Sequence, residues 1–522
     1  PTDLDAMPDA SDEDGPADPV PAKTQGMAAT AIGLTFTVDG SATALQITAG
    51  WGRYARRDHP DPEQLTSKGA RRWVWQRTQL RAVSPPLPLV VGALPEWSPA
   101  PEFPDVTVRG MVRRRHDEWS VTLYLTNRQR KPKGRTTDGV DSYWIFQPEL
   151  EVAAPDGAPI FCKHLRLRDT ARRDPEELAM QMAYRHEVEF GVGHGVAVQA
   201  ELAPGMDGRA VRLRTKVIPT YEVGRTTPPT PDDLPALADV VLDMQTLADI
   251  PDTDFAAALT PLTAAYAAWI DAQAAQLGGP DLLPYSTAPQ ETIAAMRVTL
   301  ARIQAGIDLL GQDAHAAAAF RFANRAMAQQ RVHTLYAQHR RQGGEPTLAE
   351  FDRPENRRWY PFQLAFVLLN LPALTQLDHP ERSDPSAAIA DLLWFPTGGG
   401  KTEAYLGLTA YTMAIRRLQG TVAGHSGLAG VAVLMRYTLR LLTLQQFQRA
   451  AALICACEAI RQEAQAAGDT QWGAEPFRIG LWVGSASTPN TTADSAEALN
   501  RTGDGRGTPY QITACPWCGS PI

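Results

Sequence analysis

Cysteine is scarce in this chain, with five residues in 522. Such a low count excludes the disulfide framework that stabilises small secreted proteins. Long apolar runs are missing as well: none reaches the roughly 18 residues that a membrane-spanning helix needs, and no segment has the pattern of a secretory signal. We therefore expect a protein of the reducing cytoplasm, without a membrane span.

An excess of one charge is also absent over most of the chain. The formal net charge is -8, but seven of the 58 acidic residues lie within residues 1–22, which hold no Lys or Arg. The remaining acidic residues nearly balance the 50 Lys and Arg residues, so global charge neither favours nor excludes nucleic acid as a partner. Residues 1–30 are predicted to form a disordered acidic tail.

Length and composition predict several globular units. Apolar residues make up 44% and charged residues 21%, enough apolar side chains for buried cores, and 522 residues exceed the size of one domain. We predict a multidomain α and β protein. The expected parts are a β-rich N-terminal domain over residues 31–230, a helical domain over 231–345 and an α/β domain over 346–522.

Changes in residue pattern define these parts. Short β-branched and aromatic runs, separated by Gly, Pro and Asp, predict strands up to about residue 223. Apolar residues then recur every three or four positions, as at Ile303, Ile307 and Leu310, which predicts a helical bundle. Further on, strand-like and helical segments alternate, and this alternation predicts a parallel sheet with right-handed crossovers. The expected strands of that sheet are residues 392–395, 431–435 and 477–484.

A glycine-rich loop between the first of these strands and a helix has the chemistry of a phosphate-binding site. Its sequence, Pro-Thr-Gly-Gly-Gly-Lys-Thr, brings backbone N–H groups to a helix N-terminus, where they can bind the oxygens of a triphosphate. Lys401 supplies a positive charge for the β and γ phosphates, and Thr402 a hydroxyl for Mg²⁺; both are expected to be catalytic. A glycine-rich turn with an exposed lysine is the alternative. The expected ATP-binding residues of the loop are Thr397, Gly398, Gly399, Gly400, Lys401 and Thr402.

The compact form of this loop resembles that of superfamily 2 helicases. The sequence RYTLRLLTLQQF after the next predicted strand resembles the helicase element that contacts the nucleic-acid backbone. Gln363 lies upstream of the loop, where related helicases use a glutamine to read adenine; a capping or solvated glutamine is the alternative. The resemblance implies nucleic-acid contacts by Arg436, Thr438, Arg440 and Gln445, whereas in the alternative interpretation these residues only open an amphipathic helix.

Several segments together resemble the helicase subunit of DISARM anti-phage systems, the DrmA type. They are PENRRWYPFQLAFVLLNLPALT, the phosphate loop with TEAYLGLTAY, RYTLRLLTLQQF, GLWVGSASTPNT and the terminal CPWCG. The resemblance is densest over about residues 315–522. It implies a superfamily 2 ATPase that engages DNA and works with a partner subunit, and it makes residues 346–522 the beginning of a RecA-like domain.

Two parts that such a motor needs are not recognisable before Ile522. They are a second acidic element that holds Mg²⁺ and the arginines of a second RecA-like domain. We therefore expect this chain to be the N-terminal portion of a longer protein, with negligible turnover by itself. A second interpretation is a nucleic-acid-binding sensor or assembly subunit in which ATP is a conformational ligand. A third, a P-loop kinase or transferase, would leave the Arg440–Gln445 element unexplained.

The two cysteines near the end have the spacing of half a zinc ribbon. Thiolates of Cys515 and Cys518 can occupy two corners of a Zn²⁺ tetrahedron, and the other two ligands are expected from residues beyond Ile522. A redox pair, or no special role, are the alternatives.

A basic loop in the β-rich region is a candidate DNA contact. Such a loop binds phosphates without regard to base sequence, and a solvated loop is the alternative. The expected DNA-binding residues are Arg128, Arg130, Lys131, Lys133 and Arg135.

Overall fold

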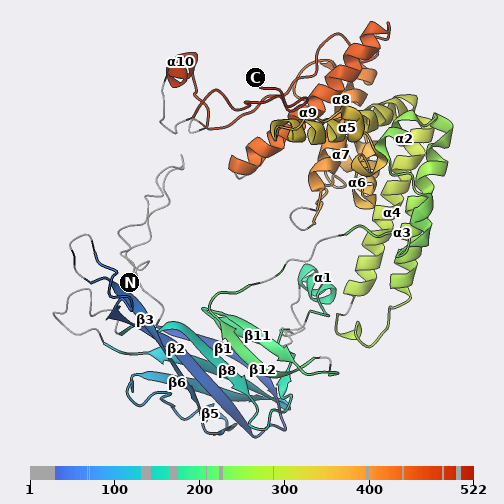
Figure 1. Ribbon diagram of the computed structural model, residues 1–522. Coiled ribbons are helices and arrows are strands. Elements are labelled where there is room, and N and C mark those ends of the chain that lie inside the picture. The colour runs from blue at the N-terminus through green and yellow to red at the C-terminus, as the bar shows by residue number, and fades with distance from the viewer. Residues whose placement is uncertain are drawn as a thin grey trace. The chain divides into compact units, whose positions relative to one another are not determined.

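The computed structural model shows two compact units, Pro1–Val223 and Gly224–Ile522, each considered by itself (Figure 1). The structure describes residues 30–66, 69, 71–130, 143–163, 174–187, 189–206, 208–220, 222, 227–285, 287–395, 399–437, 440–484, 487–500 and 507–522. The predicted acidic tail therefore lies almost entirely outside the described residues. Within these residues no helix combines the length and the apolar character needed to cross a membrane.

The N-terminal unit is built on one large antiparallel sheet, as the blue and green arrows of Figure 1 show. The strand order along its main path is β3-β2-β8-β12-β9-β1-β7-β6-β5, with β4, β10 and β11 paired alongside. Short helix α1 (Pro175–Ala183) belongs to the same unit. The strands are β1 (Ala31–Asp39), β2 (Ala44–Asp58), β3 (Trp73–Val83), β4 (Leu87–Pro88), β5 (Gly92–Ala93), β6 (Val106–Arg115), β7 (Glu118–Asn127), β8 (Phe146–Ala153), β9 (Phe161–Cys162), β10 (Gly191–His194), β11 (Ala197–Leu202) and β12 (Arg209–Lys216). The β-rich character predicted for this region is confirmed.

Alternation of apolar side chains explains this sheet. On β1, Leu34, Phe36 and Val38 are fully buried, because side chains two residues apart point to the same face of a strand. Strand β2 is buried only over its first half; beyond Trp51 its side chains become progressively exposed. The β2–β3 hairpin therefore extends past the hydrophobic core.

The second unit is mainly helical. Its helices are α2 (Met244–Asp249), α3 (Phe255–Ala274), α4 (Ala288–Gln312), α5 (Ala314–Arg341), α6 (Pro361–Thr375), α7 (Pro380–Ser383), α8 (Lys401–Gln419), α9 (Arg440–Ala466) and α10 (Thr492–Asn500). A short hairpin joins β13 (Thr421–Val422) to β14 (His425–Ser426). Helix α5 packs against α8 and α9, and α4 packs against α3 and α6. One hydrophobic core contains residues between Leu237 and Phe477. The predicted helical domain and the segment that holds the glycine-rich loop therefore belong to the same core.

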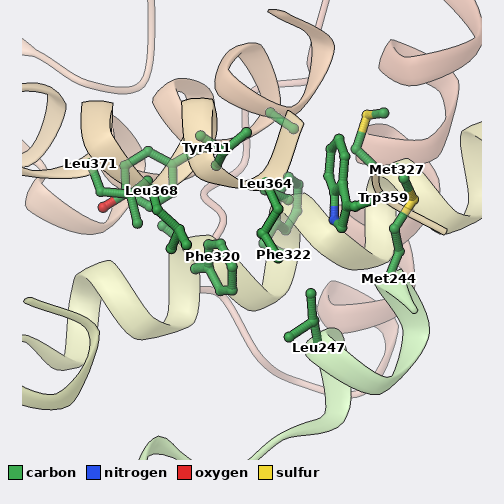
Figure 2. Close-up of a cluster of buried hydrophobic side chains, with 14 of the residues drawn as sticks. Met244, Leu247, Phe320, Phe322, Met327, Trp359, Leu364, Leu368, Leu371 and Tyr411 are labelled. Carbon is green, nitrogen blue, oxygen red and sulfur yellow. The ribbon is translucent and has the colours of Figure 1, made fainter. Parts of the chain in front are cut away.

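Trp359 is one of the large buried side chains of that core (Figure 2). The indole N–H of Trp359 donates to Asn324 Oδ1 over 2.8 Å, which satisfies a polar group that burial would otherwise leave without a partner. Helix α8 approaches this ring at Gly407, where an added Cβ would lie 2.8 Å from the indole. The second half of the predicted apolar stripe on α4, including Ile303 and Ile307, is buried in the same core. The phosphate-loop helix is therefore packed rigidly against α6 and α5.

The parallel sheet expected in the second half of the chain does not form among the described residues. The extensive sheet is antiparallel and lies in the first unit, and the described residues of 392–395, 431–435 and 477–484 form no strand. Several of their apolar side chains are exposed, with Leu392 at 84% and Trp482 at 97%. Sequence pattern identifies segments with strand character, but a strand forms only when neighbouring strands bind its backbone N–H and C=O groups. These described segments have no such strand pairing.

Candidate nucleotide-binding site

The glycine-rich loop ends where the sequence predicted a helix to begin. Gly400 is the N-cap of α8 and has a φ of 86°, a left-handed conformation that favours glycine, and Lys401 is the first helical residue. The side-chain amine of Lys401 donates to the carbonyl oxygen of Phe395, so it reaches back across the loop. Of the predicted loop ligands, Gly399, Gly400, Lys401 and Thr402 are described, whereas Thr397 and Gly398 lie outside the described residues.

The first turn of α8 has the electrostatics that a phosphate requires. The first N–H groups of a helix have no intrahelical acceptor, and the helix dipole adds partial positive charge at that end. Among the described residues no side-chain capping bond is made at Gly400. The half-buried Lys401 and Thr402 lie in this turn, together with Glu403, which is paired with two arginines. This end of α8 can therefore bind an anion, with an ammonium and a hydroxyl beside it.

The side-chain amide of Gln363 joins the start of α6 to the glycine-rich loop. It is buried in the first turn of α6, where its Oε1 accepts from the backbone N–H of Tyr360 at 2.8 Å. Its Nε2 donates to the carbonyl oxygen of Gly400 at 2.7 Å. Gln363 thus caps α6 and fixes Gly400 simultaneously. The capping alternative from the sequence is present, and so is the proximity to the phosphate loop.

An aromatic contact joins the same two segments. The rings of Phe362 on α6 and Phe395 before the loop stack with centroids 4.0 Å apart. Phe395 occupies the position where a small residue is common in the resembling helicases. Its ring is accommodated by stacking on Phe362 of α6.

Glu403 connects the phosphate-loop helix to two other helices. This buried carboxylate lies two residues after Lys401 and forms ion pairs with Arg331 of α5 at 3.4 Å and with Arg449 of α9. Arg449 in turn follows the expected nucleic-acid element on α9. Glu403 was not selected from the sequence. The signal that could have identified it is a carboxylate on the buried face of an amphipathic helix.

The element expected to contact nucleic acid lies at the start of α9, which begins at Arg440. Gln445 is exposed on this helix, and exposed Arg436 precedes it. Thr438 lies outside the described residues, as does the side chain of Arg440. A groove of about 490 Å³ lies beside this segment, between α6, α8 and residues 432–437. Burial raises the pKa of the Tyr437 hydroxyl at its edge.

The basic loop of the N-terminal unit is described only at its start. Exposed Arg128 pairs with Glu96, which also accepts from Arg109 at 2.8 Å. Much of the charge of Arg128 is therefore balanced locally, whereas Arg130 is exposed. Lys131, Lys133 and Arg135 lie outside the described residues.

The two terminal cysteines lie in a tight turn docked on α5. The backbone N–H of Gly519 donates to the carbonyl oxygen of Cys515 at 2.9 Å, and that of Cys515 donates to Ser520 at 2.8 Å. The Trp517 ring stacks on His333 with centroids 3.4 Å apart, and Arg340 donates to the carbonyl oxygen of Cys518 at 3.1 Å. The turn is therefore held by α5 through side-chain and backbone contacts.

A complete zinc site is not formed by the described part of the chain. No group of three or more His, Cys, Asp or Glu side chains there is arranged to hold a metal ion. Cys455 on α9 is close enough for the charges of Cys515 and Cys518 to add to the effect of burial, which raises the pKa of its thiol. The Cys515–Cys518 turn thus supplies two ligands at most by itself.

Similarity to known proteins extends over most of the chain. No protein-family model matches it. The chain is 33% identical over 416 residues to the DISARM protein DrmA of Bacillus paralicheniformis, an alignment that covers 77% of this chain and 34% of that protein. The chain thus spans about a third of the length of this curated relative. The resemblance expected from the sequence motifs is confirmed, and the chain belongs to the DrmA-type family of DISARM proteins.

Proposed function

We propose that this chain contributes the ATP-binding part of a superfamily 2 DNA helicase or translocase that acts in anti-phage defence. The observation that carries the proposal is the junction of loop and helix: left-handed Gly400 is followed directly by Lys401 at the uncapped N-terminus of α8. The rest of α8 is buried in the core, so these donors are held in a fixed position. Similarity to DrmA supports the defence role.

In this proposal each residue of the first turn has one task. Backbone N–H groups of the loop and of α8 bind phosphate oxygens, Lys401 moves from the carbonyl oxygen of Phe395 to the β and γ phosphates, and Thr402 contributes a ligand to Mg²⁺. Gln363 keeps Gly400 in place through its bond to the carbonyl oxygen. Hydrolysis of the ATP bound there supplies the free energy for movement on DNA.

We further propose that the segments 392–395, 431–435 and 477–484 are strands of a RecA-like parallel sheet. Exposed Leu392 and Trp482 support this, since apolar side chains of a parallel sheet are covered on both faces by helices and neighbouring strands. The remaining strands and the acidic and arginine elements would come from the rest of a DrmA-type protein, of which the alignment covers 34%.

DNA contacts are proposed at the start of α9, by Arg436, Thr438, Arg440 and Gln445. The ion pair between Glu403 and Arg449 supports coupling, because it connects the phosphate-loop helix directly to α9. A further partner, another subunit of the DISARM system, is proposed from the family alone.

ATP hydrolysis by the full-length protein, with and without single-stranded DNA, tests this function. We expect DNA-stimulated hydrolysis that Lys401→Ala abolishes, because the ammonium stabilises charge on the transferring phosphoryl group. Lys216→Ala, on β12 of the other unit, is the matched control and should hydrolyse ATP like the unmodified protein.

Two results would change the assignment. Hydrolysis retained in Lys401→Ala would place the ATPase site elsewhere. Tight DNA binding without turnover in any of the proteins would favour the sensor or assembly subunit, in which ATP acts only as a conformational ligand.

A further inference from the structure

The outer part of the β2–β3 hairpin combines positive charge with exposed aromatic rings. We name this part, residues 53–58 and 71–77, the distal hairpin; it contains six arginines and a single carboxylate, Asp58. It extends beyond Trp51, the last fully buried aromatic residue of β2, so its side chains add little to the hydrophobic core. The balanced charge of the whole chain conceals this local excess.

Strand register brings both rings and two of the six arginines onto one face. Arg56 is directly opposite Trp75, and Tyr54 is directly opposite Arg77, in the antiparallel β2–β3 pair. Trp73 and Trp75 are two residues apart, so they share that face. Trp73 is 48% exposed and Trp75 41% exposed, although large apolar side chains are usually covered.

The arginine and the two indoles form one packed cluster. The guanidinium carbon of Arg56 lies 4.1 Å from the ring centroid of Trp73 and 5.4 Å from that of Trp75. The two indoles meet edge to face with centroids 5.5 Å apart. These contacts hold the rings in place before any ligand arrives, which lowers the entropy cost of binding.

Two carboxylates that would repel a polyanion, Glu149 and Glu151, lie beside the other end of the hairpin, whereas Asp61 and Glu63 lie in the loop at its tip. Glu151 pairs there with Arg81 and Arg212, at 3.3 Å in each case, and Arg214 lies 3.5 Å from Glu149. On the distal hairpin, Asp58 pairs with Arg71 at 3.5 Å. Five arginines remain in excess there over carboxylates, counting six against one.

We propose that the distal hairpin binds single-stranded DNA, with bases stacked on Trp73 and Trp75 and phosphates contacted by its arginines. Single-stranded nucleic acid offers unstacked bases and phosphates together, and exposed aromatic rings beside guanidinium groups match both. In duplex DNA the bases are stacked inside and do not reach the indoles. The choice of DNA over RNA rests on the proposed function, but the surface itself is independent of the phosphate loop.

Strand addition by a second copy of the chain is the competing use of this surface. Strand β3 is at the end of the sheet order, so one of its edges has no strand partner among the described residues. However, repeated arginines on an edge strand oppose pairing with an identical, equally basic strand. Charge complementarity therefore favours a polyanion.

Binding of a fluorescent 20-nucleotide oligo-dT to the chain, measured by anisotropy, tests the proposal. We expect Trp73→Ala/Trp75→Ala to weaken binding at least about fivefold, and Trp73→Phe/Trp75→Phe to retain most of it because a flat ring remains. Tyr184→Ala, which removes another exposed aromatic residue from the same unit, is the control and should leave affinity unchanged.

The salt dependence of the same binding tests the role of the arginines. Arg56→Ala/Arg72→Ala should flatten the plot of log affinity against log salt concentration. Each phosphate that the protein no longer neutralises should reduce the slope by about 0.7, because fewer counterions leave the single strand on binding.

Photo-crosslinking locates the contact directly. DNA carrying 5-iododeoxyuridine should crosslink to the tryptic peptide Trp73–Arg77, which follows Arg72 and ends at Arg77. ATP hydrolysis without DNA should be unchanged in the tryptophan variants, and oligo-dT should still crosslink to this peptide in Lys401→Ala. These two results distinguish a failure of the DNA-binding proposal for the distal hairpin from a failure of the ATP-binding proposal for the phosphate loop.

Several results would overturn the proposal. These are oligo-dT affinity unchanged in Trp73→Ala/Trp75→Ala, an equal loss in Tyr184→Ala, and crosslinks confined to other peptides. Preference for oligo-U by tenfold or more would replace DNA by RNA as the occupant. Dimers that dissociate in the tryptophan variants would assign the surface to a second copy of the chain instead.

Discussion

The side-chain nitrogen of Gln363 donates a hydrogen bond to the backbone carbonyl oxygen of Gly400 over 2.7 Å. This bond joins the first turn of α6 to the last residue before the phosphate-loop helix. The same side chain accepts from the N–H of Tyr360, so the loop and the start of α6 are held by one amide. A residue that the family resemblance assigned to adenine recognition therefore also has a direct structural role.

Gln363→Ala should weaken nucleotide binding and lower stability by about 1–2 kcal/mol, because the part-buried carbonyl of Gly400 loses a hydrogen-bond donor. If Gln363 acts by holding Gly400, affinities for ATP and GTP should fall by the same factor; if it reads adenine, only the affinity for ATP should fall. Titration with fluorescent ATP and GTP analogues makes this comparison. Gln419→Ala is the control, since Gln419 makes a similar bond to the carbonyl oxygen of Thr375 at the far end of α8.

Glu403→Gln should destabilise the protein by about 2 kcal/mol, because Arg331 and Arg449 would lose a buried anionic partner. Partial exposure of both arginines keeps the loss below that of a fully buried pair. Urea unfolding followed by circular dichroism measures this effect. Arg325→Ala breaks the exposed Arg325–Glu463 pair between the same α5 and α9 helices, and should cost less than about 1 kcal/mol. Equal losses in both variants would refute a special role for Glu403.

Glu458 on α9 should make stability depend on acid pH. Hydrogen bonds from Arg461 lower the pKa of this carboxyl from 4.5 to about 2, against the opposing effect of burial. A lowered pKa in the folded state means that Glu458 stabilises the protein above about pH 4.5, and that this contribution is lost as pH falls towards 2. Unfolding free energies measured over this range should therefore decrease less in Glu458→Gln than in the unmodified protein.

The expected size of that difference is about 1–2 kcal/mol, after allowance for solvent screening. Glu463→Gln, whose carboxylate is exposed, should retain the acid dependence of the unmodified protein. Parallel pH profiles for the unmodified protein and Glu458→Gln would contradict the assignment.

Zinc binding stays a proposal, because a complete site needs ligands in addition to Cys515 and Cys518. We expect the full-length protein to contain bound Zn²⁺ that Cys518→Ser removes, because loss of one thiolate leaves an incomplete tetrahedron. Elemental analysis after extensive dialysis measures the metal, and Cys162→Ser, in the other unit, is the control. A full-length protein free of zinc would reduce the Cys515–Cys518 turn to a structural feature held by His333 and Arg340.

Local patterns predicted the elements more successfully than their partners. Short β-branched and aromatic runs, such as the one that holds Leu34, Phe36 and Val38, identified the β-rich region. The spacing of Ile303 and Ile307 identified the helical bundle, because the side-chain period depends only on the backbone geometry of the helix. The expected parallel sheet did not form among the described residues. Strand pairing joins segments that are distant in sequence, and the periodicity within one segment does not specify which other strand it will pair with. The same limit concealed the distal hairpin, whose Arg56 and Trp75 come together only through the register of β2 and β3.

The sequence by itself determined the chemistry of the phosphate loop: glycines before Lys401 and Thr402 define a side-chain-poor turn followed by an ammonium and a hydroxyl, and the motifs around them determined the family. Only the tertiary structure decided what holds that loop in place. Gln363 reaches Gly400 across 37 residues, and Glu403 meets arginines from two other helices. Such contacts depend on how the helices pack in space. Packing brings together side chains that are far apart along the chain, and their positions in the sequence do not predict the contact.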